Sequence, residues 1–397
     1  MRILMINVVC GIRSTGRICT DIATVLEKQG HEVKIAYGRE NVPEQYERFA
    51  VRIGTDSDVK LHALKARLQD GSGFGSKKAT VKFVEWVKEY NPDVIHLHNI
   101  HGYYINLAVL FEYLRTCGKR IIWTLHDCWA FTGHAAFCEY ANCDKWKKGC
   151  GNCPKRDDYP VSLTDHSAQN WNKKRSLLTG VPQMTIVTPS HWLESLVKES
   201  FLSEYSTKVI PNGIDASVFK PTESDIKTRL GIEDRKMILG VAALWEKRKG
   251  LEDFIELSKR LDKEFRIVLV GISKEQMKLI PDNIICLEKT NSPTELVELY
   301  SAADVFLNPT YEDNYPTVNL EAIACGTPVI TYDTGGSPES AEIFGCILPK
   351  KDLDGVINTL NAMNFEKKEV DIFKEYMVNQ YVELIQTNGE SPVHEIG

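Results

Sequence analysis

The sequence lacks any long run of apolar residues. No stretch approaches the roughly 18 apolar residues that a membrane-spanning helix requires, and the apolar start at residues 1–9 is too short for a secretory signal peptide. A positive net charge is also missing, because 48 Lys and Arg stand against 54 Asp and Glu. The net charge of −6 argues against a non-specific grip on nucleic acid. We therefore expect a cytoplasmic protein that binds no nucleic acid.

The length of 397 residues exceeds one ordinary domain and favours two. Short runs rich in Ile, Val and Leu alternate with helical patterns, as in strands buried on both faces of a parallel sheet. The expected strands are 2–9, 32–37, 93–98, 120–125, 184–188, 237–242, 265–271, 283–287, 305–308 and 328–332. This order predicts an α/β protein built from two doubly wound, Rossmann-like domains.

Turn residues at 211–213, Pro-Asn-Gly, indicate a linker between the two halves. The expected domains are 1–208, with a Cys-rich insert at 134–160, then 209–370, and a C-terminal helix and tail at 371–397. In open α/β sheets ligands bind beyond the carboxyl ends of the strands. Two such domains in tandem therefore predict a cleft between them.

The most specific segment of the sequence is 308–322, in which an expected strand is followed by an acidic loop and then by an expected helix. Pro316 suits the first helical position. The N–H groups of Thr317 and Val318 would then form a phosphate site at the helix N-terminus. Glu321 could accept hydrogen bonds from ribose hydroxyls, and Asp313 from the hydroxyls of a sugar. Taken alone, such an acidic pair is more often a solvated loop and a helix-capping Glu.

A basic motif, residues 246–250, follows the first expected strand of the second half. It places Arg248 and Lys249 at the carboxyl end of a strand, where a diphosphate would lie. Lys249 is the first choice for neutralising a leaving diphosphate. A solvated basic turn is the alternative.

In the first half, a turn with Gly11 and Gly16 follows the first strand and opens a helix. Glycines let the backbone approach a ligand closely, and the helix end attracts phosphate. A tight strand-to-helix connection is the alternative. His98 and His126 each end an apolar strand, where functional residues gather in such sheets, although either could be a satisfied structural histidine.

Eleven cysteines in a reducing compartment favour thiols or metal ligands over disulfides. Cys138, Cys143, Cys150 and Cys153 fall within sixteen residues and end in a C-x2-C pair. This spacing predicts a structural Zn²⁺ site with four thiolates. Metal ligation would supply folding energy that so short an insert cannot gain by burial. Thiols without a metal, or a disulfide formed on isolation, are the alternatives.

A mildly amphipathic basic helix is expected before the Gly- and Ser-rich loop at 71–76. Its charged and apolar members are Lys60, Leu61, Leu64, Lys65, Arg67 and Leu68. Such a helix could rest on anionic lipid and receive a lipid-linked acceptor. An ordinary surface helix with solvated lysines is the simpler interpretation.

Taken together, these motifs resemble the family 4 glycosyltransferases of GT-B fold, and the chain is similar to enzymes of capsular and exopolysaccharide biosynthesis. The resemblance covers nearly the whole chain. Its segments are 312–329, 248–250, 211–215 with Phe219, 188–190 and the N-terminal Gly-rich turn.

The resemblance implies a retaining transfer from a UDP- or GDP-sugar to a saccharide acceptor, lipid-linked in surface polysaccharide biosynthesis. The N-terminal domain would bind the acceptor and the C-terminal domain the donor, without a catalytic metal, and the donor phosphate would help to deprotonate the acceptor. The implied catalytic residues are Lys249, Arg248, His126 and Asp313. The implied donor-binding residues are Gly16, Gly271, Asn314, Tyr315, Pro316, Thr317, Val318 and Glu321. A sugar-nucleotide epimerase of the same fold and a non-catalytic nucleotide-sugar-binding protein are the alternatives.

Two positions depart from the family pattern. The first of the family's two acids is usually Glu, and here it is Asp313, which leaves the contact with the donor sugar open. The Arg usually found five positions before Lys249 is Leu244 here. Arg248 or Lys247 must therefore take the place of that Arg.

Overall fold

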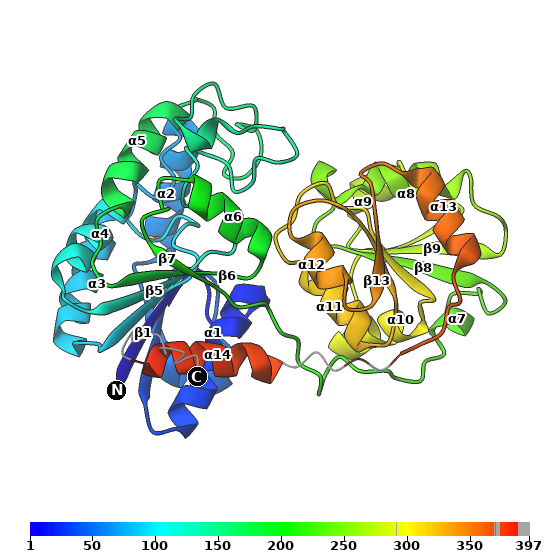
Figure 1. Cartoon of the computed structure of the whole chain (residues 1–397), viewed down its shortest axis with the longest axis horizontal. Helices are drawn as coiled ribbons and strands as arrows, with labels where there is room; N and C mark the ends of the chain where they lie inside the picture. The colour runs from blue at the N-terminus through cyan, green and yellow to red at the C-terminus, as the bar shows by residue number, and fades with distance from the viewer. Residues whose placement is uncertain (291, 369, 371–373, 388–397) are drawn as a thin grey trace, which may run out of the picture. The chain divides into compact units, whose positions relative to one another are not determined.

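The computed structural model describes residues 1–290, 292–368, 370 and 374–387, which divide into two compact α/β units (Figure 1). The first unit comprises Met1–Pro211 together with residues 376–387, and the second comprises Asn212–Glu375. The boundary expected at 208/209 thus lies three residues before the observed division at 211/212. Residues 371–373 and 388–397 of the expected C-terminal tail lie outside the described residues.

The first unit is built on a seven-stranded sheet of order β3-β2-β1-β4-β5-β6-β7, in which all neighbours are parallel. Its strands are β1 (Arg2–Asn7), β2 (Glu32–Tyr37), β3 (Ala50–Arg52), β4 (Val94–Leu97), β5 (Arg120–Thr124), β6 (Met184–Thr188) and β7 (Ser206–Val209). The five strands expected in this half are confirmed. The short edge strands β3 and β7 were not expected.

Helices cover both faces of this sheet. They are α1 (Arg13–Lys28), α2 (Asp56–Gln69), α3 (Lys77–Tyr90), α4 (Leu107–Thr116), α5 (Ser167–Leu178), α6 (His191–Glu199) and α14 (Lys374–Gln386), with the 3₁₀ turns η1 (Glu44–Phe49) and η2 (Lys145–Lys147). Side chains of α1 and α14 share one core with the sheet, and those of α3, α4 and α6 share the other. Buried strands between two helical layers explain the apolar runs in the sequence.

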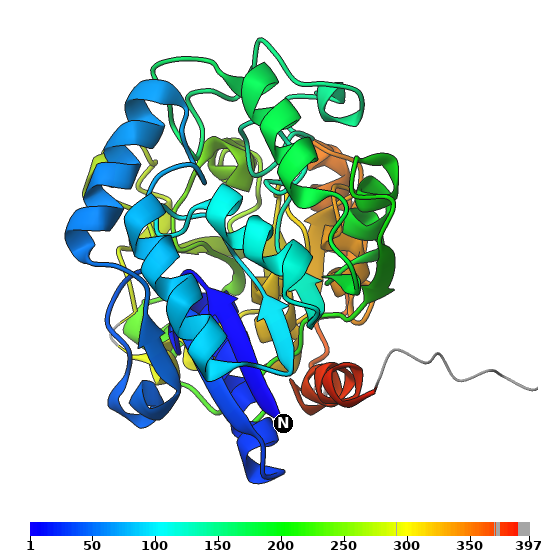
Figure 2. The ribbon, with the colours of Figure 1, turned by 90° about the vertical axis from the view of Figure 1, so that its left-hand side faces the viewer.

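The final helix, α14, completes the first unit. Its Met377 and Tyr381 are almost fully buried, in the same core as Ile3 of β1. The guanidinium of Arg120 donates to the carbonyl of Ile385 at 3.2 Å. In both views α14, drawn in red, lies beside the strands of the first unit (Figure 1, Figure 2). The described part of the expected C-terminal helix thus packs on the first unit, where its apolar face covers β1.

The second unit has a six-stranded parallel sheet of order β10-β9-β8-β11-β12-β13. Its strands are β8 (Lys236–Val241), β9 (Phe265–Val270), β10 (Ile284–Leu287), β11 (Val305–Asn308), β12 (Val329–Tyr332) and β13 (Gly345–Leu348). Its helices are α7 (Ile226–Arg229), α8 (Leu251–Ser258), α9 (Lys274–Met277), α10 (Pro293–Ala302), α11 (Thr317–Ala324), α12 (Ser337–Ala341), α13 (Leu353–Ala362) and the 3₁₀ turn η3 (Lys247–Lys249). Because β9 and β11 both pair with β8, the strand order reverses there.

Local sequence signals explain several helix starts. The hydroxyl of Thr55 accepts from the N–H of Asp58 at 3.2 Å, and the Asp58 carboxylate accepts from Thr55 in return, which forms a capping box at α2. The side chain of Ser190 accepts from the N–H of Leu193 and caps α6, and the side chain of Asn106 accepts from the N–H of Val109 and caps α4. Among the described residues, no helix combines the length and the apolar character needed to span a bilayer.

Candidate functional site

Lys249 and Asp313 follow neighbouring strands of the second sheet. η3 follows β8 and the acidic loop follows β11, and these two strands pair in parallel, so both loops leave the sheet at the same edge. The Nζ atom of Lys249 lies 2.5 Å from Oδ2 of Asp313. This contact lies where the strand order reverses, which is the position at which open α/β sheets bind ligands.

Backbone contacts fix the basic turn against the acidic loop. The N–H of Tyr311 donates to the carbonyl of Arg248 at 2.7 Å, and the guanidinium of Arg248 donates to the carbonyl of Glu312 at 3.0 Å. Gly250 has a φ of +74°, and a Cβ there would lie 2.2 Å from the carbonyl oxygen of Pro309. Only glycine fits this approach, so the two motifs form one assembly.

The charges at this edge are balanced locally. Burial alone would raise the pKa of Asp313, but the charges of Lys249 and Arg248 outweigh it and hold that pKa below its ordinary value. The backbone N–H of Asn314 donates to Oδ1 of Asp313 at 3.0 Å. Asp313 is therefore an ionised acceptor. An ammonium has three donors, so the contact with Asp313 leaves Lys249 able to donate to an anion as well.

The N-terminus of α11 lies directly after the acidic loop. Pro316 is the N-cap and not the first helical residue as expected, because its ψ of 116° is extended, and the helix begins at Thr317. The first N–H groups of a helix have no acceptor within the helix. Those of Thr317 and Val318 thus belong to a helix end of the kind that binds phosphate.

Glu321, one turn into α11, is held by a side chain that the sequence interpretation missed. The hydroxyl of Tyr300 donates to Oε2 of Glu321 at 2.9 Å, and Tyr300 is fully buried. Burial and the nearby Glu321 carboxylate both raise the pKa of Tyr300, so it remains a donor. No local pattern marks this residue, since it lies on α10, 21 positions before Glu321.

A third loop, after β12, closes on the acidic loop. The N–H of Gly336 donates to the carbonyl of Asp313 at 3.1 Å, and the hydroxyl of Thr334 donates to the carbonyl of Tyr311 at 2.8 Å. A Cβ on Gly335, whose φ is +57°, would lie 1.9 Å from the Asp313 carbonyl oxygen. The Gly-Gly pair after an apolar strand is the signal that could have identified this loop.

Three further predicted donor residues have clear packing roles. Asn314 is 4% and Tyr315 9% exposed, and burial raises the pKa of Tyr315 to about 12. Gly271 directly follows β9 with a φ of +91°, and a Cβ there would lie 1.7 Å from the carbonyl oxygen of Ala242. Leu244, in the position of the family's Arg, is 60% exposed. Donor contacts of these residues stay predictions.

In the first unit, His98 and His126 follow the neighbouring strands β4 and β5, and their rings are in contact. Nδ1 of His98 lies 3.1 Å from Nε2 of His126. Burial lowers the pKa of His126 to about 4, although Asp127 opposes the shift. Burial also lowers the pKa of His98 far below its ordinary value, and the charges of His96 and His126 lower it further. Both rings are therefore neutral near pH 7.

A second polar chain lies beside this pair and includes two residues that the sequence interpretation missed. Nε2 of His101 lies 2.9 Å from Oδ2 of Asp127, and Nδ1 of His101 lies 3.2 Å from the hydroxyl of Tyr159. Burial opposes ionisation of Asp127, but His101 and the N–H of Trp129 lower its pKa. Tyr159 comes from the Cys-rich segment (134–160), so this segment reaches the carboxyl end of the first sheet.

Gly16, the predicted donor residue of the first unit, lies inside α1 and is buried. A Cβ there would lie 3.0 Å from Cγ2 of Val9, and the carbonyl of Gly16 accepts from the N–H of Gly11 at 3.2 Å. Its glycine identity follows from close packing of α1 beneath the loop after β1. Its predicted donor contact is untested.

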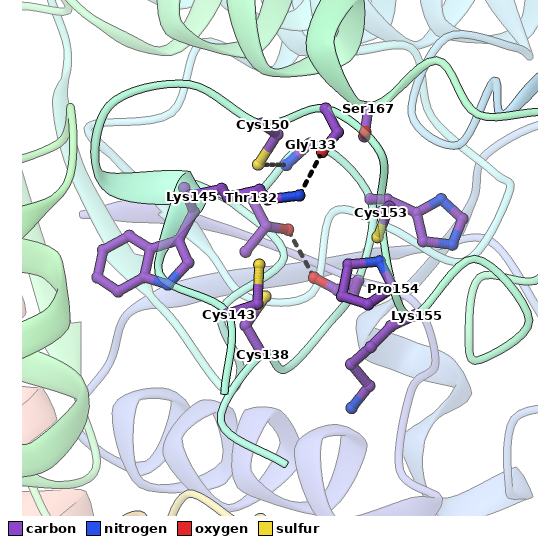
Figure 3. A pocket seen from close by; sticks show the side chains of 14 residues that line it. Thr132, Gly133, Cys138, Cys143, Lys145, Cys150, Cys153, Pro154, Lys155 and Ser167 are labelled. Carbon is purple, nitrogen blue, oxygen red and sulfur yellow. Dashed lines mark hydrogen bonds between the residues drawn. The ribbon is translucent and has the colours of Figure 1, made fainter. Parts of the chain in front are cut away.

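The four cysteines predicted to bind zinc line one cavity of about 20 Å³ on the connection between β5 and α5 (Figure 3). All four are half-buried, and none is joined in a disulfide. Within the described part of the chain, no three His, Cys, Asp or Glu side chains lie close enough together to hold a metal ion as they stand. Zinc binding therefore stays a prediction.

Two family models match the chain. The glycosyltransferase family 4 model matches residues 15–218, and the model for glycosyl transferases group 1 matches residues 235–363. A protein of Escherichia coli (strain K12) named as the colanic acid biosynthesis glycosyl transferase WcaC is 24% identical over 364 residues, covering 87% of this chain and 86% of that protein. The alpha-galactosylglucosyldiacylglycerol synthase of Streptococcus pneumoniae is 31% identical over 173 residues, covering 40% of this chain and 46% of that protein.

Solved structures show the same fold. HepE of Anabaena in complex with UDP has a TM-score of 0.66 at 15% identity, covering 97% of this chain and 99% of that chain. Sucrose-phosphate synthase of Thermosynechococcus elongatus has a TM-score of 0.62 at 17% identity, covering 96% and 94%. The expected GT-B fold of two Rossmann-like α/β units is confirmed. Since the family 4 model alone spans more than half of the 397 residues, the chain belongs to glycosyltransferase family 4.

Proposed function

We propose that this protein is a retaining glycosyltransferase that moves a sugar from a nucleotide-sugar donor to a saccharide acceptor in surface polysaccharide biosynthesis. The observation that carries the proposal is the Lys249–Asp313 contact beside the N-terminus of α11. The relative named for colanic acid biosynthesis supports the pathway class. The HepE structures with UDP and UDP-glucose make a UDP-sugar the favoured donor.

The donor would lie along the carboxyl edge of the second sheet. Its diphosphate would meet Lys249, Arg248 and the first N–H groups of α11, which together offer positive charge and donors to an anion. The Glu321 carboxylate, fixed by Tyr300, would accept from the ribose hydroxyls. The carboxylate of Asp313, which is ionised, would accept a hydrogen bond from a hydroxyl of the transferred sugar.

The chemical step breaks the bond between the anomeric carbon and the diphosphate oxygen. Negative charge then grows on the leaving diphosphate, so cations placed there stabilise the transition state more than the ground state. The acceptor oxygen forms the new bond on the same face, and its proton passes to the departing phosphate. Lys249 and Arg248 would supply the electrostatic part of this step.

The acceptor would bind to the first unit, where His126 and the His101–Asp127–Tyr159 chain end at the carboxyl edge of the sheet. We propose further that α2 contacts an anionic membrane that carries a lipid-linked acceptor. Leu61, Leu64 and Leu68 on α2 are 66%, 53% and 47% exposed, interleaved with lysines and an arginine. Exposed leucines beside cations suit the boundary of an anionic bilayer.

The decisive experiment is calorimetric titration of the full chain with UDP, GDP and their common sugar conjugates, followed by measurement of diphosphate release with added saccharide acceptors. Binding of one nucleotide class with acceptor-dependent release supports the transferase and identifies its donor. Conversion of the donor sugar without an acceptor would indicate an epimerase. If no nucleotide binds, both the glycosyltransferase and the epimerase are excluded. Liposome flotation tests the membrane contact. If the protein does not bind anionic liposomes at low salt, the proposed membrane contact is wrong.

A further inference from the structure

The cavity lined by Cys138, Cys143, Cys150 and Cys153 is the strongest unassigned site in the described chain. Its volume of about 20 Å³ is that of roughly one water-sized sphere. The cysteines enter it from different parts of one irregular loop (Figure 3). Four thiols around a space for one small particle match the ligand number and type of a structural Zn²⁺ site.

The backbone around the cavity already donates to the sulfurs. The N–H of Gly133 lies 3.2 Å from Sγ of Cys150, and the N–H of Lys155 donates to Cys153. Gly133 must be glycine for this approach, because a Cβ there would lie 2.1 Å from the carbonyl oxygen of Ser167. Backbone amides that donate to cysteine sulfur are a common feature of the surroundings of a metal–thiolate site.

Two of the four cysteines directly follow an asparagine whose backbone is in the left-handed conformation. Asn142, directly before Cys143, has a φ of +48°, and Asn152, directly before Cys153, has a φ of +49°. Asparagine is one of the few residues with a side chain that tolerates this conformation. A left-handed asparagine thus precedes the second cysteine of each pair, Cys143 in the first pair and Cys153 in the second.

Cations surround the cavity. Lys145 and Lys155 line it. Lys174 is fully buried nearby, donates to the carbonyls of Trp129 and Thr132 at 2.6 and 3.1 Å, and interacts electrostatically with Cys150 and Cys138. A Zn²⁺ ion with four thiolates carries a net charge of −2, which the flanking Lys145 and Lys155 would offset.

We propose that Cys138, Cys143, Cys150 and Cys153 bind one structural Zn²⁺ ion. The four thiols line one cavity but do not lie at coordination distance as they stand, so binding of the ion itself would draw them together. The ion fastens the Cys-rich segment, which carries Tyr159 to His101. The site lies outside the proposed donor machinery of the second unit, so zinc binding and glycosyl transfer can be tested separately.

The test is metal analysis of the full chain purified under reducing conditions without added chelator. About one zinc ion per chain is expected, and Co²⁺ exchanged into the site should show the visible bands of a tetrahedral thiolate complex. Cys143→Ser and Cys150→Ser should lose most of the bound zinc. Cys117→Ser is the matched control, because Cys117 is half-buried in the same unit but does not line the cavity.

Each outcome decides the proposal. Zinc in the wild-type chain and in Cys117→Ser, with loss in the two cavity variants, supports it. Iron in place of zinc, a metal-free wild-type chain, or full zinc content in Cys150→Ser would overturn it. If the variants fail to fold, the Co²⁺ spectrum of the wild-type chain decides alone, since non-tetrahedral or thiolate-free coordination contradicts a four-cysteine site. None of these readouts depends on transferase activity.

Discussion

The Nζ atom of Lys249 lies 2.5 Å from Oδ2 of Asp313, and this contact joins the loops that follow β8 and β11. The side chains are only 19% and 16% exposed, so each charge depends on the other more than a pair at the surface would. A donor diphosphate that reached this edge would meet a cation already oriented by a carboxylate. The pair is therefore a preorganised element of the proposed donor site.

Replacing Lys249 with Ala should raise the donor KM and lower kcat. Loss of a cation that stabilises the leaving diphosphate costs on the order of 100-fold in kcat/KM. Steady-state kinetics with the identified donor measures the effect. Lys259→Ala is the control, because Lys259 is exposed at the end of α8 and pairs with Glu256. Equal kinetics for both variants would contradict the role of Lys249.

Replacing Tyr300 with Phe should weaken nucleotide binding by roughly 10-fold, because Glu321 loses the buried hydroxyl that orients it. The effect should fall mainly on the donor Kd, measured by calorimetry, since ribose is bound equally in ground and transition states. Tyr332→Phe is a matched control that removes a buried hydroxyl bonded to Asp253. If both variants bind the nucleotide equally well, Tyr300 has only a structural role.

The sequence patterns predicted the central strands and the edge strand β10, and missed the other three edge strands. β3, β7 and β13 were not expected, and all three are edge strands of four residues or fewer that are largely half-buried. A strand with one open edge needs no continuous apolar run, so its pattern is weak. The wholly buried strands, such as β4 and β11, gave the clearest signal.

The candidate site was predictable where its residues belong to motifs in the loops that follow predicted strands. Arg248 and Lys249 lie in the loop after β8 and Asp313 in the loop after β11, and the structure brings them together. Tyr300 lies inside α10 and His101 in the loop after β4, both outside the recognised motifs, so their contacts with Glu321 and Asp127 could not be identified in this way. Such contacts depend on which loops meet in three dimensions, which local spacing does not record.

Acid should destabilise the first unit before its carboxylates titrate. Burial lowers the pKa of His126 to about 4 and that of His96 to about 3. In the unfolded chain these rings take up protons near pH 6.5, so the unfolded state binds protons first as the pH falls. Stability is therefore complete above about pH 6.5 and declines progressively towards the lowered pKa values.

The measurement is the melting temperature of the full chain between about pH 8 and 5, followed by spectroscopic probes of the first unit. His96→Gln should flatten the decline, because it removes one buried titrating ring. His191→Gln should leave the decline unchanged, since the His191 side chain is 77% exposed. A melting temperature that stays constant from pH 7 to about 5 would refute the predicted linkage.

Replacing Tyr159 with Phe should raise the acceptor KM several-fold and leave the donor Kd unchanged, if the first unit binds the acceptor as proposed. The Tyr159 hydroxyl lies 3.2 Å from Nδ1 of His101, whose other nitrogen contacts Asp127. Loss of the hydroxyl frees the imidazole to change tautomer and orientation, so a sugar hydroxyl bound nearby is positioned less well.

The control for this prediction is Tyr140→Phe, since Tyr140 lies in the same Cys-rich segment, is 44% exposed and carries the Lys155 ammonium over its ring. A merely structural role for Tyr159 would lower the melting temperature and change both substrate constants together. An acceptor KM that rises alone would instead identify Tyr159 as a positioning residue. Tyr159 belongs to the Cys-rich segment that the proposed zinc ion would hold in place. Removal of bound zinc should therefore raise the acceptor KM as well.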